Sequence, residues 1–266
     1  MAVTVASYAN NSSDASFSVT KPTGTADGEL LIGFMSCNSA VISWPAGWTA
    51  IETGTNCDLR YKIASSEGSS YSFDPGGVRT SVAILRVTGV TTSPIDTHSK
   101  KANASSTTVS ANTITPTTAN NALFFFAGAS GCSGGNLVSG YTVATSPPSF
   151  SEVLETSYGG TNAALGIAYG IRPETTATGA GTATLATASA NEGFLLSLNV
   201  FEVSMTAAQG SFTYTGYAAT IASAFQLVVT HMSYALTGLT ARLTRVTDIW
   251  SNISKNVSSW INSTRT

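Results

Sequence analysis

The stretch Glu29-Leu30-Leu31-Ile32-Gly33-Phe34-Met35 is an apolar run of strand length that follows the turn-forming pair Asp27-Gly28. Similar runs, separated by clusters of Gly, Pro, Asn, Asp and Ser, recur through the first 203 residues, and their β-branched and aromatic content is typical of strands. They are Trp48–Ile51, Leu59–Ala64, Ser81–Val87, Leu123–Ala127, Leu165–Ile171 and Phe194–Val203. Because residues 1–203 show no helical apolar stripe, the sequence predicts an all-β fold, a jelly-roll-like antiparallel β-sandwich followed by an extended β-repeat C-terminal segment.

The composition indicates an extracellular or particle-like surface. Charged residues make up 10% of the 266 residues, against roughly 25% in an ordinary soluble domain, and Ser, Thr, Ala, Gly and Asn fill the polar positions. This surface argues against a cytosolic enzyme. The formal net charge of −2 argues against nucleic acid as the main partner. The sequence shows neither a signal-peptide pattern nor a run of about 18 apolar residues, so membrane insertion is not expected.

The charge is unevenly distributed along the chain. Residues 1–203 hold eight Lys and Arg against thirteen Asp and Glu, a balance of −5, whereas residues 204–266 hold four Lys and Arg against Asp248, a balance of +3. We therefore expect the two regions to face different partners. Residues 1–203 are predicted to form the β-sandwich, and residues 204–266 an extended repeat segment for anchoring or oligomerisation.

The sandwich region is predicted to be internally duplicated, over about 1–92 and 118–203. Ala26–Leu30 is echoed by Ala119–Leu123, and Pro45–Trp48 by Pro147–Phe150. The two halves would form two related sheets packed face to face, with Ser93–Thr117 as a polar crossing between them. Chance similarity among strand sequences is the alternative.

The C-terminal segment contains two short repeats. Ser211–Ile221 recurs as Ser233–Leu243, a shift of 22 residues, and Trp250–Lys255 recurs as Trp260–Arg265, a shift of 10. Apolar and polar residues alternate in the first repeat, which is strand periodicity. The aromatic side chains would form an exposed apolar stripe unless a partner covers them, so we expect oligomer or anchor contacts there. The residues expected to make these contacts are Phe212, Tyr214, Tyr234, Trp250 and Trp260.

These features together resemble a family of virion structural proteins of tailed bacteriophages, in which a β-sandwich precedes Gly-Ser-Phe-x-x-x-Gly and Trp-x-Asn-x-Ser-Lys repeats. The motifs in this chain that carry the resemblance are Gly28–Ile32, Pro45–Thr49, Tyr61–Ala64, Leu85–Val90, Pro94–Asp96, Gly210–Gly216 and Trp250–Lys255. The chain departs from the repeat pattern at Met232 and at Ser263-Thr264-Arg265. The resemblance implies a particle component of the tail, fibre or decoration type, and leaves open whether it belongs to the head or the tail.

Catalytic and metal-binding patterns are absent from the sequence. His98 and His231 are the only histidines, and we expect His98 in a solvated loop and His231 at a strand end. A glycosidase would need two facing carboxylates, for which Glu152 and Glu155, with Asp58 and Asp74, are the nearest candidates. The three cysteines have no metal-site spacing and are expected to be small buried thiols. We predict no enzyme activity, no cofactor and no metal, with a glycan-degrading tail spike as the less favoured alternative.

Aromatic side chains near turns and Gly-rich loops are candidates for sugar contact, because they offer stacking surfaces beside polar groups. Trp44, Tyr141 and Tyr158 are the residues predicted for this role. Trp48 and Tyr61 are expected to pack inside the sandwich.

The sequence therefore leads to the expectation of a non-enzymatic virion protein, made in the bacterial cytoplasm and located on the virion surface. The favoured role is a tail fibre or minor tail protein with host-glycan adhesion, and the alternative is a head decoration protein, either capsid cement or a head fibre. Expected partners are further copies of the chain, most naturally in a homotrimer, and other capsid or tail proteins bound through the C-terminal segment.

Overall fold

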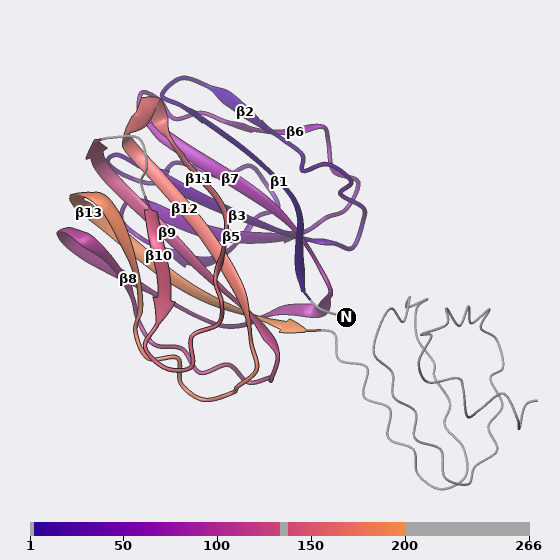
Figure 1. Ribbon diagram of the computed structural model, residues 1–266. Helices are drawn as coiled ribbons and strands as arrows, with labels where there is room; N and C mark the ends of the chain where they lie inside the picture. The colour runs from indigo at the N-terminus through magenta and orange to yellow at the C-terminus, as the bar shows by residue number, and fades with distance from the viewer. Residues whose placement is uncertain (1–2, 134–137, 201–266) are drawn as a thin grey trace, which may run out of the picture. The chain divides into compact units, whose positions relative to one another are not determined.

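The computed structural model describes residues 3–133 and 138–200. These residues form thirteen β-strands and one short 3₁₀ turn, η1 (Tyr158–Gly160), and the strands pair antiparallel (Figure 1). The predicted all-β sandwich of antiparallel sheets is confirmed. The C-terminal segment, with Phe212, Tyr214, Tyr234, Trp250, Trp260 and His231, lies outside the described residues.

The first half of the chain forms one five-stranded sheet and a small two-stranded sheet. The five strands follow the order β1-β7-β3-β5-β4, and β2 pairs with β6. Their bounds are β1 Thr4–Ser13, β2 Phe17–Thr20, β3 Leu30–Cys37, β4 Thr49–Thr53, β5 Cys57–Ile63, β6 Ser70–Phe73 and β7 Thr80–Thr88.

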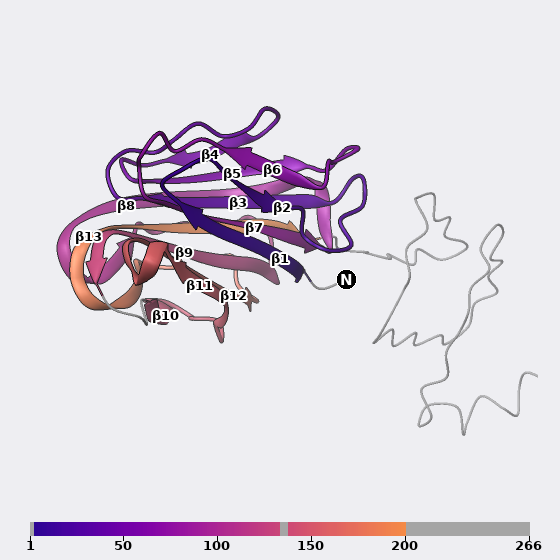
Figure 2. The ribbon, with the colours of Figure 1, turned by 90° about the horizontal axis from the view of Figure 1, so that it is seen from above.

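The second half forms the other large sheet, in the order β10-β13-β9-β12-β11, with β8 paired to the free side of β13. The bounds are β8 Val90–Ala111, β9 Asn121–Ser133, β10 Val138–Val143, β11 Ser151–Ser157, β12 Thr161–Arg172 and β13 Gly181–Val200. The start of β13 pairs with β10 and its later part with β9, whereas β8 accompanies it along both parts. Between Thr184 and Ser189 the register shifts, and Figure 2 shows β8 and β13 curving together around one edge of the molecule.

Apolar side chains fill three layers. The inner core lies between the large sheets, where the Phe34 ring centroid is 5.3 Å from that of Phe126 and 5.4 Å from that of Phe194. A second cluster lies on the other face of β9, under β10 and the first part of β13. A third, including Trp48, covers the outer face of β3 and β7. Both faces of β3 are therefore buried, which explains why its sequence is continuously apolar rather than alternating.

The two large sheets share a strand order: β7, β3, β5 and β4 occupy the places that β13, β9, β12 and β11 occupy in the second sheet. Thr49 at the start of β4 pairs with Tyr61, and Ser151 at the start of β11 pairs with Tyr169. Edge strands also meet across the sandwich, because β1 contacts β11 and β4 contacts β8. This is the arrangement that the predicted duplication would produce, although the duplication itself remains a prediction.

The predicted polar crossing at Ser93–Thr117 is wrong, because most of it belongs to the 22-residue strand β8. His98 is likewise in a strand rather than in a loop, and its Nδ1 lies 3.0 Å from Glu52 Oε1 on β4. The Lys100 ammonium of β8 donates to the carbonyl of Thr53, which is also on β4. β8 is an edge strand with few buried side chains, so it lacks the apolar alternation by which strands are predicted.

The strands define two ends of the sandwich. At the first, here called the corner end, β3 and β9 finish, Ser36 pairs with Cys57 and Ser130 pairs with Ala190. At the other, the Val200 end, β3 and β9 begin and Val200 pairs with Val90. The ten residue-to-residue steps from Ala190 to Val200 extend over about 33 Å at the usual rise of a strand.

Candidate functional site

A pocket of about 190 Å³ opens at the corner end, between the β4–β5 turn and the bend of β8 and β13. It is lined by Thr55, Asn56, Cys57, Ala102, Asn103, Gly128, Ser130, Ala190, Asn191 and Glu192. Since these residues come from both sheets, the pocket exists only when the sandwich is assembled.

Glu192 is the charged group of this pocket, and its residue is 5% exposed. The backbone N–H of Thr55 donates to Oε1 over 2.7 Å, and that of Cys57 donates to Oε2 over 2.9 Å. The turn is closed by a hydrogen bond from Gly54 N to the carbonyl of Cys57, and a Cβ at Gly54 would collide with Oε2. The carboxylate is therefore held in one place by the turn of the opposite sheet, which compensates part of the cost of burying its charge.

Two asparagines hold the bend of β8 and β13 beside Glu192. Asn103 Nδ2 donates to Asn191 Oδ1 over 2.9 Å and to the carbonyl of Ser110 over 3.0 Å. Asn191 is 3% exposed, and its Nδ2 donates to the carbonyls of Ser189 and Ser106 over 3.0 and 3.2 Å. These amides satisfy carbonyls that the regular ladder leaves unpaired where its register shifts.

The rest of the lining supplies a third amide, a hydroxyl and a thiol. The Asn56 amide contacts Ser130 in either of its two orientations. In one, Asn56 Nδ2 donates to Ser130 Oγ over 2.9 Å; in the other, Ser130 Oγ donates to Asn56 Oδ1 over the same distance. Burial raises the pKa of the Cys57 thiol well above its ordinary value, and the Glu192 carboxylate adds to that shift. Cys57 is thus a neutral small side chain and not a nucleophile. The oxygens of Glu192 and Ser130 are therefore acceptors in the lining.

Trp44, the first residue predicted to contact sugar, is half-buried, and its ring packs against other aromatic rings. Its ring centroid lies 5.0 Å from that of Trp48 and 5.4 Å from that of Phe73, and the ring covers Gly33. Trp48 is 7% exposed and therefore buried as predicted, but it lies in the cluster on the outer face of β3 and β7 rather than between the two large sheets. Tyr61 also packs against the inner core, although it is only half-buried.

Tyr141 is brought together with the two glutamates that were the nearest glycosidase candidates. Its ring meets Phe125 edge-on at 5.7 Å, and its hydroxyl is buried without a hydrogen-bond partner among the described residues. Burial raises its pKa, and the charges of Glu152 and Glu155 raise it further. Burial, followed by the charge of Glu155, also raises the pKa of Glu152. Glu155 Oε2 accepts from Val138 N over 3.2 Å, so this carboxylate helps to hold β10.

Tyr158, in η1, lies at the corner end and is half-buried. The Arg79 guanidinium carbon is 6.0 Å from its ring centroid. A hydrogen bond with the Asp14 carboxylate raises the pKa of its hydroxyl. Of the three predicted sugar-contact residues, Tyr158 is the one that shares an end of the sandwich with the pocket.

The remaining acidic candidates have structural partners. Asp58 is fully buried, and its carboxylate accepts from Arg60 Nε and Thr53 Oγ1, both over 2.7 Å. Asp74 accepts from Ser16 Oγ over 3.1 Å. These hydrogen bonds join neighbouring strands and turns. They do not pair Asp58 or Asp74 with Glu152 or Glu155.

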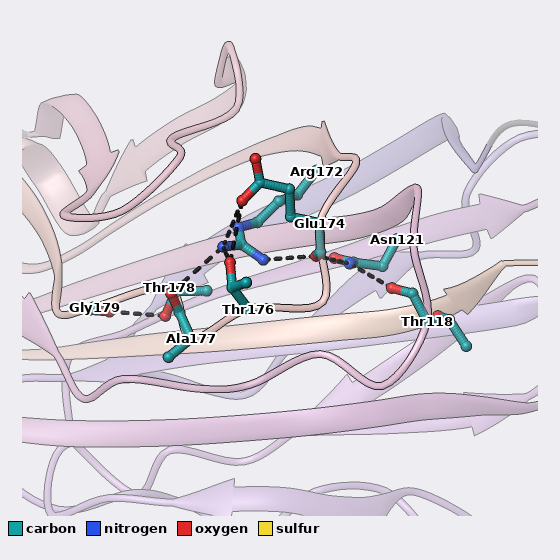
Figure 3. Close-up of polar contacts among 8 residues, drawn as sticks. All are labelled: Thr118, Asn121, Arg172, Glu174, Thr176, Ala177, Thr178 and Gly179. Carbon is teal, nitrogen blue, oxygen red and sulfur yellow. Dashed lines mark hydrogen bonds and ion pairs between the residues drawn. The ribbon is translucent and has the colours of Figure 1, made fainter.

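Arg172, which no sequence motif distinguished, is fully buried at the Val200 end (Figure 3). Nη1 donates to the carbonyl of Glu174 over 2.7 Å, and Nη2 donates to Thr176 Oγ1 over 3.0 Å and to the carbonyl of Ala177 over 3.4 Å. Figure 3 shows the guanidinium enclosed by the 174–179 loop, with Asn121 and Thr118 beside it. The guanidinium thus organises the connection between β12 and β13.

Sequence reasoning also missed the pocket residues Asn103, Ser130, Asn191 and Glu192. The available signal was Asn191-Glu192-Gly193, a polar interruption directly before the apolar run that begins at Phe194. Cys37 and Cys57 are buried and free, as predicted for small core thiols, and the side chain of Cys132 lies outside the description.

Within residues 3–133 and 138–200, no group of three or more His, Cys, Asp and Glu side chains is placed to hold a metal ion. The same residues contain no helix long and apolar enough to cross a membrane. Comparison of the chain with protein-family models, curated proteins and solved structures found no match.

Proposed function

We propose that this chain is a non-enzymatic structural protein of a tailed-phage virion, displayed on the particle surface as a tail fibre or minor tail protein that contacts host glycans. The resemblance of its sandwich and repeat motifs to such proteins is one support. The other is the described fold, whose buried polar side chains Asp58, Arg172 and Glu192 hold strands and loops in place.

The arrangement of the two ends is the observation that carries the proposal. Val200, after which the aromatic-rich C-terminal segment follows in sequence, lies at the end of the sandwich where β3 and β9 begin, whereas the pocket, at the bend in the middle of β13, and Tyr158 lie at the corner end. A protein anchored through residues 204–266 would be attached beyond Val200. Its corner end, with the pocket and Tyr158, would then be available to contact the host surface.

The test is the copy number and position of the chain in purified particles. Quantitative mass spectrometry gives the copy number, and electron microscopy gives the position when a gold label is attached to a cysteine introduced at exposed Ala188. Cys37 and Cys57 are buried and burial raises the pKa of both, so they react poorly. Particles with the unaltered chain measure background labelling, including any at Cys132.

A few to a few dozen copies labelled on the tail would support the proposal. Hundreds of copies over the head would replace it with capsid decoration, and absence from particles would overturn both. Release of reducing ends from host envelope glycans by the purified chain would overturn the non-enzymatic part.

A further inference from the structure

We propose that the corner-end pocket binds one sugar residue of a host surface glycan through hydroxyl hydrogen bonds to Glu192, Asn56 and Ser130. This inference rests on the proposed adhesive function and assigns the adhesion to a defined place. It differs from the expectation drawn from Trp44 and Tyr141, whose aromatic rings are used in packing.

The Glu192 carboxylate is oriented before any ligand arrives. Each of its oxygens accepts one backbone N–H, and a carboxylate oxygen has capacity for a second hydrogen bond. The turn that supplies these N–H groups is joined to β3 by hydrogen bonds, including Cys37 N to the carbonyl of Asn56 over 2.7 Å. A ligand would therefore meet acceptors fixed by both sheets, which lowers the entropy lost on binding.

The chemistry of the lining favours a hydroxylated ligand. A sugar hydroxyl can donate to a Glu192 oxygen, and a neighbouring hydroxyl can donate to Ser130 Oγ, whose own proton goes to the carbonyl of Ala190 over 3.4 Å or, with the Asn56 amide turned over, to Asn56 Oδ1. A divalent cation such as Ca²⁺ takes six to eight oxygen ligands, and this lining offers one carboxylate.

The size and the rim fit a single ring. The pocket volume of about 190 Å³ is below the roughly 300 Å³ at which sites for drug-sized ligands begin. Thr55, Ala102 and Ala190 are the exposed residues of the lining, so the rest of a glycan chain could pass over small side chains there. Since no aromatic ring lines the pocket, we expect millimolar affinity for a free monosaccharide and tighter binding only when several copies act together.

The experiment is a titration of the ¹⁵N-labelled full chain, followed by NMR, with free glucose, galactose, mannose, rhamnose and N-acetylglucosamine. The backbone amides of Thr55 and Cys57 report on Glu192 directly, because they donate to its carboxylate. We expect saturable shifts of these amides with at least one sugar. Methylguanidinium is titrated in parallel as the cationic probe.

Two variants separate the pocket from the rest of the surface. Ala190→Phe places a ring in the mouth and should weaken binding at least tenfold. Ala188→Phe adds the same ring at an exposed position of β13 outside the lining and should leave binding unchanged. Both positions are exposed, so both variants are expected to fold, and unchanged spectra away from the pocket would verify this.

Sugar-induced shifts that Ala190→Phe removes and Ala188→Phe retains would support the proposal. It would be overturned if no sugar shifts these amides, if Ala190→Phe binds as well as the unaltered chain, or if methylguanidinium alone saturates the site. Any of these negative results would leave the particle location intact. Absence from particles would instead defeat the proposed function, whatever the pocket binds.

Discussion

At the scale of single residues, the described structure depends on buried polar groups whose partners lie in loops. Arg172 and Glu192 are almost completely enclosed, and each uses its charge to hold backbone groups of a connection. A buried charge is tolerated when hydrogen bonds replace its hydration, and removing it leaves the partner groups unsatisfied. These two positions are therefore expected to be much less tolerant of substitution than exposed charges.

The Arg172→Met variant tests this expectation. Methionine fills a similar volume but donates nothing, so the carbonyls of Glu174 and Ala177 and the hydroxyl of Thr176 lose their donor. We expect the free energy of unfolding to fall by about 2–4 kcal/mol, measured by chemical denaturation. Arg79→Met, at an exposed arginine, is the matched control and should cost less than about 1 kcal/mol. Equal losses in the two variants would show that the buried guanidinium has no special role.

At the scale of elements, the bent ribbon of β8 and β13 is the feature that joins the layers. The later part of β13 pairs with β9 and belongs to the main sheet. The first part of β13 pairs with β10 and lies over the outer face of β9, and β8 pairs with both parts. The bend needs close backbone approach: a Cβ on Gly193 would lie 2.5 Å from the carbonyl oxygen of Ser110 and 2.8 Å from its carbon. Both obstacles are backbone atoms, so no side-chain rotation can make room.

Gly193→Ala is therefore expected to open the bend and to lower the free energy of unfolding by about 1–3 kcal/mol. The control is Gly68→Ala, at an exposed loop glycine where the nearest atom to an added Cβ is 3.9 Å away. Chemical denaturation compares the two variants under the same conditions. If Gly193→Ala were as stable as Gly68→Ala, the close approach would not be a constraint on the fold.

At the scale of the whole molecule, the described residues bury their own apolar surfaces. The inner core and the two outer clusters are all formed within residues 3–200. Large apolar side chains with substantial exposure are few in this part, namely Tyr8, Ile63 and Ile171. A self-contained sandwich of this kind needs no partner to complete its core, unlike the predicted repeat segment.

We therefore expect a fragment of residues 1–203 to be folded and monomeric, and the full chain to oligomerise. Light scattering coupled to size-exclusion chromatography measures both masses, and circular dichroism verifies the β content of the fragment. An oligomeric fragment of the same order as the full chain would place self-association in the sandwich and contradict the anchoring role predicted for Phe212, Tyr214, Tyr234, Trp250 and Trp260.

The strands that were predicted and those that were missed differ in burial. β3, β5, β7, β9, β12 and β13 carry apolar runs because they lie against one or two packed layers, and these were predicted. The edge strand β4 was also predicted, through the run Trp48–Ile51. β1, β8 and β11 are edge strands with many exposed Ser, Thr and Asn side chains, and their local sequence resembles that of loops. What makes them strands is hydrogen bonding to a neighbour that the local sequence does not reveal.

The sequence by itself determined the all-β class and the core strands, because apolar content over a few residues is a local property that burial requires. The tertiary structure decided how the candidate aromatics pack and where the pocket around Glu192 forms. Glu192 meets the backbone of Thr55 and Cys57 across separations of 137 and 135 residues. Such a contact depends on the packing of one sheet on the other, and no spacing along the chain encodes it.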